Sequence, residues 1–222
     1  MMNLSVTDKL LKAAAPVWEK CLNHPFVTGI GDGTLDVEKF KFFMLQDYLY
    51  LFDYAKVFAL GVVKAREPEL MHTFAKNVDA VLGGEMNIHR AYMKRLGITE
   101  EQVFSVQPAL DNLSYTHYMM SVASTGTPME IVASILACSW SFAEIGQALA
   151  KIPGAMEHPF YGEWILGYAS EEYAATNAAL IRLMNELAKD ASEEQMKYLT
   201  EIFVNCSRYE LGFWDMAWEM RQ

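Results

Sequence analysis

The helical character of this chain is clearest between residues 36 and 65, which read DVEKFKFFMLQDYLYLFDYAKVFALGVVKA. Apolar side chains recur in this stretch at steps of three and four, the spacing that places residues on one face of an α-helix. This apolar stripe comprises Phe40, Phe43, Asp47, Tyr50, Tyr54, Val57 and Gly61. Asp47 is its one acidic member, and a buried carboxylate is costly unless it has a partner or a chemical role.

Two further apolar stripes each contain a reactive side chain. One comprises Ile131, Ile135, Cys138, Phe142, Ile145 and Leu149. The other comprises Met196, Leu199, Phe203, Cys206, Glu210, Phe213, Ala217 and Met220. Either carboxylate alone could be a structural group paired with a buried Arg, Lys or Tyr, and a lone Cys is often only a small core residue. Asp47, Cys138 and Glu210 together favour a catalytic pocket inside a helical bundle.

Helix signals recur along the chain and strand signals do not, which predicts an all-α fold. We expect helices over about residues 5–22, 36–65, 67–96, 109–124, 127–152 and 192–222, and a short helix that begins at Thr99. A further helix runs from about residue 158 through Tyr168, continues or restarts at Ser170 and ends near Lys189. The segment Gly29–Thr34 predicts a turn-rich link, and Gly83–Gly84 predicts a close helix contact or a break. No linker, repeat or low-complexity segment interrupts the 222 residues, so we expect one domain over residues 1–222.

Composition excludes several classes of partner. The formal net charge is −10 with no basic patch, which argues against binding to nucleic acid. The three cysteines form no CxxC pair and fit a reducing compartment. The N-terminus lacks the pattern of a signal peptide. The longest apolar run, Ile131–Ala143, falls short of the roughly 20 residues that span a bilayer. These features predict a soluble, cytoplasmic protein without a membrane segment.

Metal and cofactor sites are also considered. Glu85 and His89 lie one helical turn apart and, with Glu144 and Asp215, could suggest a di-iron carboxylate bundle. That architecture needs paired Glu-x-x-His motifs, which the sequence lacks, so we expect no metal and read His89 as a hydrogen-bonded or surface histidine. His24 could be an axial haem ligand, but the following Pro25 favours a capping role. No nucleotide-binding or Gly-x-Ser-x-Gly motif occurs, so no cofactor is expected.

The stretches around these residues resemble the thiaminase II (TenA) family, in order and over nearly the whole chain. The matching segments are His24-Pro25-Phe26-Val27, Gly29 through Leu35, Leu45-Gln46-Asp47-Tyr48-Leu49-Tyr50, Ser114-Tyr115-Thr116, Cys138-x-Trp140 and Tyr209-Glu210-x-x-Phe213-Trp214. The resemblance implies a fold like that of haem oxygenase, without haem, assembled as a homotetramer. It also implies hydrolysis of 4-amino-5-aminomethyl-2-methylpyrimidine to the 5-hydroxymethyl pyrimidine and ammonia in thiamin salvage. Some members of the family also cleave thiamin itself.

The resemblance assigns a role to seven positions. Cys138 matches the nucleophile, Glu210 the proton donor and Tyr50 a tyrosine that makes the cysteine more nucleophilic. Asp47 matches a carboxylate that contacts the aminopyrimidine. The remaining pocket positions are Tyr115, Phe142 and Tyr168. Many members carry Tyr where this chain has Phe142, so the hydroxyl contact made there is absent and the exact substrate is left open.

The residue types suit this reaction. A thiolate can add to the pyrimidine ring, Glu210 can protonate a ring nitrogen, and Asp47 can accept from the 4-amino group. A thiol in an apolar pocket resists ionisation, which a hydrogen bond from Tyr50 would offset. Two alternatives stay open at this point. One is a metal-dependent oxygenase on the same scaffold, and the other is a non-catalytic protein that binds a pyrimidine or a protein partner and acts in regulation.

Overall fold

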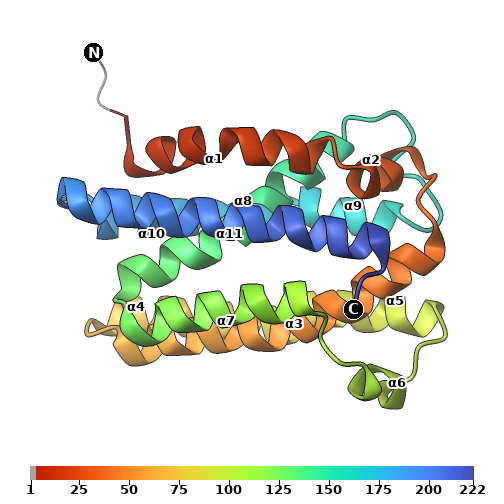
Figure 1. Cartoon of the computed structure of the whole chain (residues 1–222), viewed down its shortest axis with the longest axis horizontal. Coiled ribbons are helices and arrows are strands. Elements are labelled where there is room, and N and C mark those ends of the chain that lie inside the picture. Colours follow the sequence, from red (N-terminus) through yellow and green to blue (C-terminus); the bar gives the residue numbers. More distant parts are fainter. Residues whose placement is uncertain (1–3) are drawn as a thin grey trace. The chain divides into compact units, whose positions relative to one another are not determined.

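The computed structural model describes residues 4–222, all of whose regular elements are helices (Figure 1). The α-helices are α1 (Val6–Leu22), α2 (Pro25–Asp32), α3 (Val37–Lys64), α4 (Pro68–Asp79), α5 (Met86–Arg95), α6 (Glu100–Ser105), α7 (Leu110–Thr125), α8 (Pro128–Leu149), α9 (Gly162–Ala169), α10 (Glu171–Leu187) and α11 (Glu193–Glu219). A π-helical turn, η1 (Ala80–Glu85), separates α4 from α5. The predicted all-α class is confirmed.

The described chain forms two compact units. The first contains the residues up to Leu35 and Val132–Trp214, and the second contains Asp36–Ile131 and Asp215–Gln222. α8 and α11 therefore contribute residues to both units. Of the predicted site residues, Cys138, Phe142, Tyr168 and Glu210 belong to the first unit, and Asp47, Tyr50 and Tyr115 belong to the second. The expectation of a single domain stays a prediction.

In the first unit, α1 begins where the sequence predicts. Ser5 and Asp8 form a capping box, in which each side chain accepts from the other residue's backbone N–H. Pro16 lies inside this helix. α1 runs beside α11 (Figure 1), and the Trp18 indole donates to the Ser207 hydroxyl over 2.9 Å. The buried Trp18 ring also packs on Phe203, which anchors the helix that carries Glu210.

The segment predicted as a turn-rich link is helical instead. α2 covers Pro25–Asp32, with His24 as its N-cap and Gly33 closing it at a φ of 77°. The His24 ring nitrogen Nδ1 accepts from the backbone N–H of Phe26, which confirms the capping role. A Cβ on Gly31 would come within 2.8 Å of the Leu149 side chain. Gly31 thus lies in a closely packed helix, whereas the sequence-based interpretation took it as part of a turn.

In the second unit, α3 begins after its N-cap Asp36 and ends at Lys64, within one residue of the prediction. Figure 1 shows α7, in green, running alongside α3, in orange. α4 also packs on α3, and a Cβ on Gly61 would come within 2.4 Å of the Phe74 ring. The predicted helix over 67–96 is divided by η1. Gly83 and Gly84 meet no neighbouring atom within 4 Å, so they mark a change of helix type and no close contact.

Burial follows the predicted stripes with two exceptions, Met196, which is half-buried, and Met220. Every member of the Asp47 stripe is buried, and Asp47 itself is 5% exposed. In the Glu210 stripe, Met220 lies beyond the end of α11 and is exposed, so its predicted burial is wrong. α8 is buried on all its faces between Glu130 and Ala143. The apolar stripe that contains Cys138 therefore does not distinguish a buried face of α8 from an exposed one, because every residue in this part of the helix is buried.

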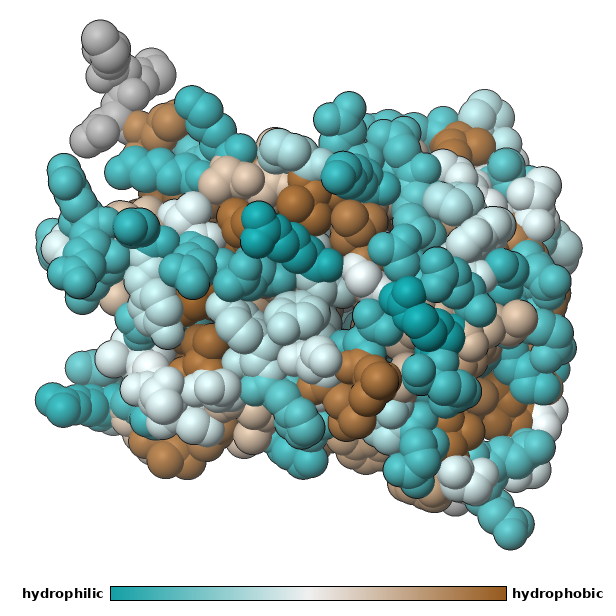
Figure 2. Space-filling model, viewed as in Figure 1, coloured by the Kyte–Doolittle hydropathy of each residue, from teal (hydrophilic) through white to brown (hydrophobic). Residues whose placement is uncertain are grey.

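α8 is also the single helix of the described chain that is long and apolar enough to cross a membrane. It extends to Leu149, further than the apolar run measured in the sequence, but most of its apolar window is buried within the protein. Such burial is typical of a core helix. On the face shown in Figure 2 the surface is mainly hydrophilic, with apolar side chains in separate groups.

Candidate active site

In the second unit, Asp47 is paired with a buried histidine. The Oδ2 atom of Asp47 lies 2.7 Å from Nε2 of His89, which is 1% exposed. The other ring nitrogen, Nδ1, lies 3.0 Å from the carbonyl oxygen of Glu85 at the end of η1. If Asp47 were only a structural group, the sequence predicted an Arg, Lys or Tyr as its partner. The structure gives it a histidine that α5 contributes.

The Asp47–His89 pair has one shared proton. A carbonyl oxygen only accepts, so Nδ1 of His89 must carry a hydrogen and donate it to Glu85. One more proton then lies between Nε2 and Oδ2, on either the imidazole or the carboxyl group. Burial by itself lowers the pKa of His89, but the hydrogen bond and charge of Asp47, with the charge of Glu85, outweigh it and raise the pKa. The ionised pair is therefore favoured.

Tyr50, which follows Asp47 by about one turn of α3, packs on Tyr115 of α7. Their ring centroids are 5.3 Å apart, and Tyr50 also stacks on Tyr54 at 5.4 Å. Both residues are buried, at 3% and 1% exposure. The Tyr50 hydroxyl donates to the sulfur of Met119 over 3.7 Å, within α7 one turn after Tyr115. The structure thus brings two of the predicted site tyrosines together.

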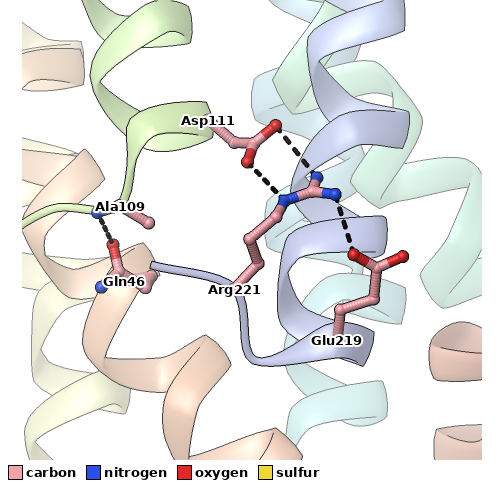
Figure 3. Close-up of polar contacts among 5 residues, drawn as sticks. All are labelled: Gln46, Ala109, Asp111, Glu219 and Arg221. Carbon is pink, nitrogen blue, oxygen red and sulfur yellow. Dashed lines mark hydrogen bonds and ion pairs between the residues drawn. The ribbon is translucent and has the colours of Figure 1, made fainter.

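Gln46 fastens the start of α7 to α3. Its side chain is fully buried, and its carbonyl oxygen accepts from the backbone N–H of Ala109 over 2.9 Å (Figure 3). Its amide donates to the carbonyl of Gln107. Asn112 on α7 donates to the backbone oxygen of Gln46 over 2.7 Å. This network fixes α7 against the turn of α3 that carries Asp47, and so sets where Tyr115 lies.

The C-terminal residues make a second, more exposed attachment to α7. The Arg221 guanidinium contacts both carboxylate oxygens of Asp111, at 3.1 and 3.2 Å, and also meets Glu219 (Figure 3). The hydrogen bond to Asp111 raises the pKa of Arg221. Three residues before Arg221, the Trp218 ring lies under the ammonium group of Lys39 on α3, which also donates to the Trp218 carbonyl.

In the first unit, the two predicted catalytic groups are both buried. Cys138 is 9% exposed on α8 and Glu210 is 3% exposed on α11. Cys206 lies one turn before Glu210 and is fully buried. Burial, and then the charge of Glu210, hold the pKa of this second thiol well above its usual value. Cys206 therefore stays a neutral thiol, in keeping with a core position.

Phe142 and Tyr168 lie together in an aromatic cluster one turn along α8 from Cys138. Their ring centroids are 4.9 Å apart, and Phe142 also packs on Trp164 and Trp214. Gly146, a further turn along α8, lets α9 approach, because a Cβ there would come within 2.6 Å of the Tyr168 carbonyl carbon. Trp214 is 1% exposed within the chain, so it is a core residue.

Sequence reasoning missed the roles of Gln46 and Gly146. It interpreted His89 as a hydrogen-bonded or surface histidine, which the structure confirms as hydrogen-bonded, but it did not find its partner Asp47. A signal for His89 was present, because Met86, His89 and Tyr92 form an apolar stripe of the kind that singled out Asp47. Gln46 follows no such pattern. Among the described residues, no group of three or more His, Cys, Asp or Glu side chains gathers as a set of metal ligands.

The fold and the helices that carry these residues define the class of protein. A domain with a haem oxygenase-like fold from Shewanella denitrificans superimposes with a TM-score of 0.79 over 98% of this chain and 93% of its own, at 17% identity. A TenA homologue from P. horikoshii superimposes with a TM-score of 0.89 over 97% of this chain and 99% of its own, at 32% identity. The architecture is the haem oxygenase-like helical fold.

The chain belongs to the TENA/THI-4/PQQC family, whose model matches residues 11–220. It is 49% identical over 218 residues to an aminopyrimidine aminohydrolase of Halalkalibacterium halodurans, covering 98% of this chain and 97% of that protein. It is 44% identical to an aminopyrimidine aminohydrolase of Helicobacter pylori, covering 97% of this chain and all of that protein. The resemblance inferred from the sequence motifs is confirmed.

Proposed function

We propose that this chain is an aminopyrimidine aminohydrolase of thiamin salvage. Its substrate would be 4-amino-5-aminomethyl-2-methylpyrimidine, which gains one water and loses one ammonia to give the 5-hydroxymethyl pyrimidine. The observation that carries this proposal is the near full-length identity to relatives that are named for this activity. The buried positions of Asp47, Cys138 and Glu210 support it, since reactive groups are costly in a core unless they have a role.

Cys138 and Glu210 would carry the bond-making steps. The thiolate of Cys138 adds to a ring carbon, and the ring electrons move to a ring nitrogen that takes a proton from Glu210. The aminomethyl group, which carries an extra proton as its ammonium form, leaves as ammonia when the exocyclic carbon–nitrogen bond breaks. Water adds to the methylene carbon and gives a proton back to Glu210. Breakage of the carbon–sulfur bond, with loss of the proton on the ring nitrogen, returns the thiolate and restores the ring. No oxidant or reductant is consumed.

The other residues would bind and orient the ring. Asp47 accepts from the 4-amino group, and Tyr115 and Tyr168 pack on the substrate with Phe142. The close ring packing of Phe142 and Tyr168 supports their joint role, because each limits the rotation of the other. Tyr50 would make Cys138 more nucleophilic, as the family resemblance implies, and its hydroxyl hydrogen would then leave Met119 to stabilise the thiolate.

The role of Glu210 is tested by Glu210→Gln, which has the same shape but cannot donate a proton as an acid. The rate of ammonia release should fall about 10²-fold or more, the scale of general acid catalysis, while substrate binding measured by calorimetry is retained. A variant with turnover close to that of the native enzyme would remove Glu210 from the mechanism.

The role of Tyr50 is tested by Tyr50→Phe, which removes the hydroxyl and keeps the ring stacked on Tyr54 and Tyr115. We expect alkylation of Cys138, followed by mass spectrometry of its peptide, to need a higher pH in this variant. Tyr54→Phe is the matched control because it removes a hydroxyl one turn further along the same helix. An unchanged alkylation profile in Tyr50→Phe would discard the activation by Tyr50.

The substrate is tested by measuring ammonia from the aminomethyl pyrimidine and thiazole from thiamin with the same enzyme preparation. Ammonia release with little thiazole supports salvage of the breakdown product, and efficient release of both supports cleavage of thiamin as a second activity. An enzyme that releases no ammonia from the aminomethyl pyrimidine would contradict the proposed reaction.

Assembly and location complete the proposal. We expect a homotetramer in the cytoplasm, as the family resemblance implies. Light scattering coupled to size-exclusion chromatography measures the first, since a tetramer of a 25.2 kDa chain has about four times that mass. A particle of monomer mass at micromolar concentration would contradict the assembly.

A further inference from the structure

We propose that His89 is a positioning residue that keeps Asp47 an acceptor-only carboxylate, and that it thereby makes the enzyme select pyrimidines with a 4-amino group. This inference deepens the proposed function and rests on Asp47 contacting the aminopyrimidine. It assigns a specificity role to a residue outside the seven positions implied by the family motifs. His89 would act through Asp47 and would not touch the substrate.

The imidazole of His89 is held in one orientation. Nδ1 of His89 can only donate to the Glu85 carbonyl, 3.0 Å away, so the Nε2 atom is committed to Asp47. The ring is 1% exposed and lies against Tyr48, with centroids 6.3 Å apart. A histidine that is hydrogen-bonded at both ring nitrogens cannot turn away from its carboxylate. In metal sites, a hydrogen bond to the second ring nitrogen of a histidine fixes its orientation in the same way.

The acidic neighbours of His89 favour the charged form of its imidazole. The groups facing His89 are Asp47 from α3 and Glu85 from η1, both acidic, while Arg90 on α5 lies over the Tyr48 ring at 5.9 Å. The two acidic groups favour imidazolium, and they overcome the opposing effect of burial on the pKa. With His89 charged, the proton of the pair lies on Nε2 and Asp47 has none to donate.

One of the two carboxylate oxygens of Asp47 is not engaged by His89. Oδ2 receives the hydrogen bond from His89, whereas Oδ1 makes no hydrogen bond with any residue that the structure describes. The Asp47 side chain keeps 7% of its surface exposed, compared with 1% for His89. This ionised carboxylate oxygen can accept a hydrogen bond, and the 4-amino group of the substrate would supply an N–H.

This arrangement discriminates between two classes of pyrimidine. A 4-amino group donates to Oδ1, whereas a 4-oxo group places a second acceptor against it. Sites built to hydrogen-bond a substrate N–H reject analogues without it by up to about 10⁴–10⁵-fold. Without the hydrogen bond from His89, nothing fixes the Asp47 carboxylate in its orientation, and a buried charge is left without its donor. The contact of Oδ1 with a 4-amino group is then weaker, so the discrimination shrinks.

The test compares kcat and KM for the 4-amino substrate and its 4-oxo analogue in four proteins. His89→Leu removes the donor, His89→Gln keeps an amide donor near the Nε2 position, and His72→Leu is a matched control at an exposed histidine of α4. We expect the native enzyme, His89→Gln and His72→Leu to prefer the 4-amino compound by at least about 10²-fold. We expect His89→Leu to lose at least tenfold of that preference, mainly through a higher KM for the 4-amino compound. An unchanged preference in His89→Leu overturns the proposal.

Two measurements separate this inference from the proposed function. Calorimetric binding of 4-amino- and 4-oxo-2,5-dimethylpyrimidine needs no turnover, so a native enzyme that releases no ammonia but prefers the amino ligand contradicts only the function. If His89→Leu fails to fold, nitrogen NMR of the native protein replaces it, with the His89 signal assigned by its loss in His89→Gln. Protons on both ring nitrogens near neutral pH support the proposal, and an unprotonated Nε2 overturns it.

Discussion

Gly146 on α8 lies directly against the backbone of Tyr168 on α9, and no side chain larger than hydrogen fits between them. A Cβ at position 146 would come within 2.6 Å of the Tyr168 carbonyl carbon and 2.8 Å of its Cβ. Because the neighbouring atoms are mostly backbone, they cannot give way as a flexible side chain can. This close approach sets the distance from Tyr168 to the cluster around Phe142.

Gly146→Ala should therefore push α9 away from α8. Overpacking of this kind costs about 1–3 kcal/mol, and the shifted Tyr168 should raise the KM for the pyrimidine. Thermal unfolding and steady-state kinetics measure the two effects. Gly83→Ala is the control, because a Cβ there meets nothing within 4 Å. Equal stability and KM in Gly146→Ala and the native enzyme would show that α9 can move without consequence.

Phe142→Tyr restores the hydroxyl that many family members carry at this position. Phe142 is 5% exposed and its ring already packs on Tyr168, so the fold should tolerate one added oxygen that reaches the substrate. One hydrogen bond contributes about 0.5–1.5 kcal/mol, which corresponds to a KM lower by roughly two- to tenfold. Kinetics with the aminomethyl pyrimidine measure it. A KM that does not change, with intact stability, would place the substrate away from Phe142.

Gln46→Ala and Arg221→Ala compare the two attachments of α7 in Figure 3. Gln46 is fully buried, and its loss leaves the Ala109 N–H without its acceptor, which costs about 1–3 kcal/mol. Arg221 has a side chain that is 45% exposed, so losing its pair with Asp111 should cost under about 1 kcal/mol and less still in high salt. Denaturant unfolding of both variants measures the difference. A larger loss in Arg221→Ala would reverse this order.

The pH dependence of stability should reveal His89. Its pKa is raised, so the folded protein keeps this proton at a pH where the unfolded chain, with its histidine near 6.5, has lost it. The stabilisation is complete below about pH 6.5 and is lost as the pH rises through the raised pKa. Between about pH 6.5 and 8 the free energy of unfolding should therefore fall with a steeper slope in the native protein than in His89→Gln.

The same window avoids a second titration. Burial, with the charge of Glu210, raises the pKa of Cys206, so this thiol also makes stability fall with pH. That fall begins only where an unfolded thiol ionises, above about pH 8.5. Cys206→Ala removes the second decline alone. Identical slopes between pH 6.5 and 8 in the native protein and His89→Gln would contradict the charged state assigned to His89.

Much of this structure could be predicted from local sequence, and the exceptions share a cause. The cap at Asp36 and the stripe containing Asp47 depend on neighbours within one or two helical turns, and both were predicted correctly. The pair of Asp47 and His89 joins residues 42 positions apart, which no helical spacing encodes. The Gly31 contact with Leu149 joins residues still further apart in the chain, and a glycine placed for packing looks the same in the sequence as one placed for a turn.

The central claim is that Cys138 is the nucleophile that releases ammonia from the aminomethyl pyrimidine. The most direct measurement is ammonia release by the native enzyme, Cys138→Ser and Cys21→Ser, at equal concentrations of folded protein. Cys21→Ser makes the same change at another buried cysteine of the same unit. The account predicts release by the native enzyme and Cys21→Ser and none above background by Cys138→Ser. Full release by Cys138→Ser would contradict it.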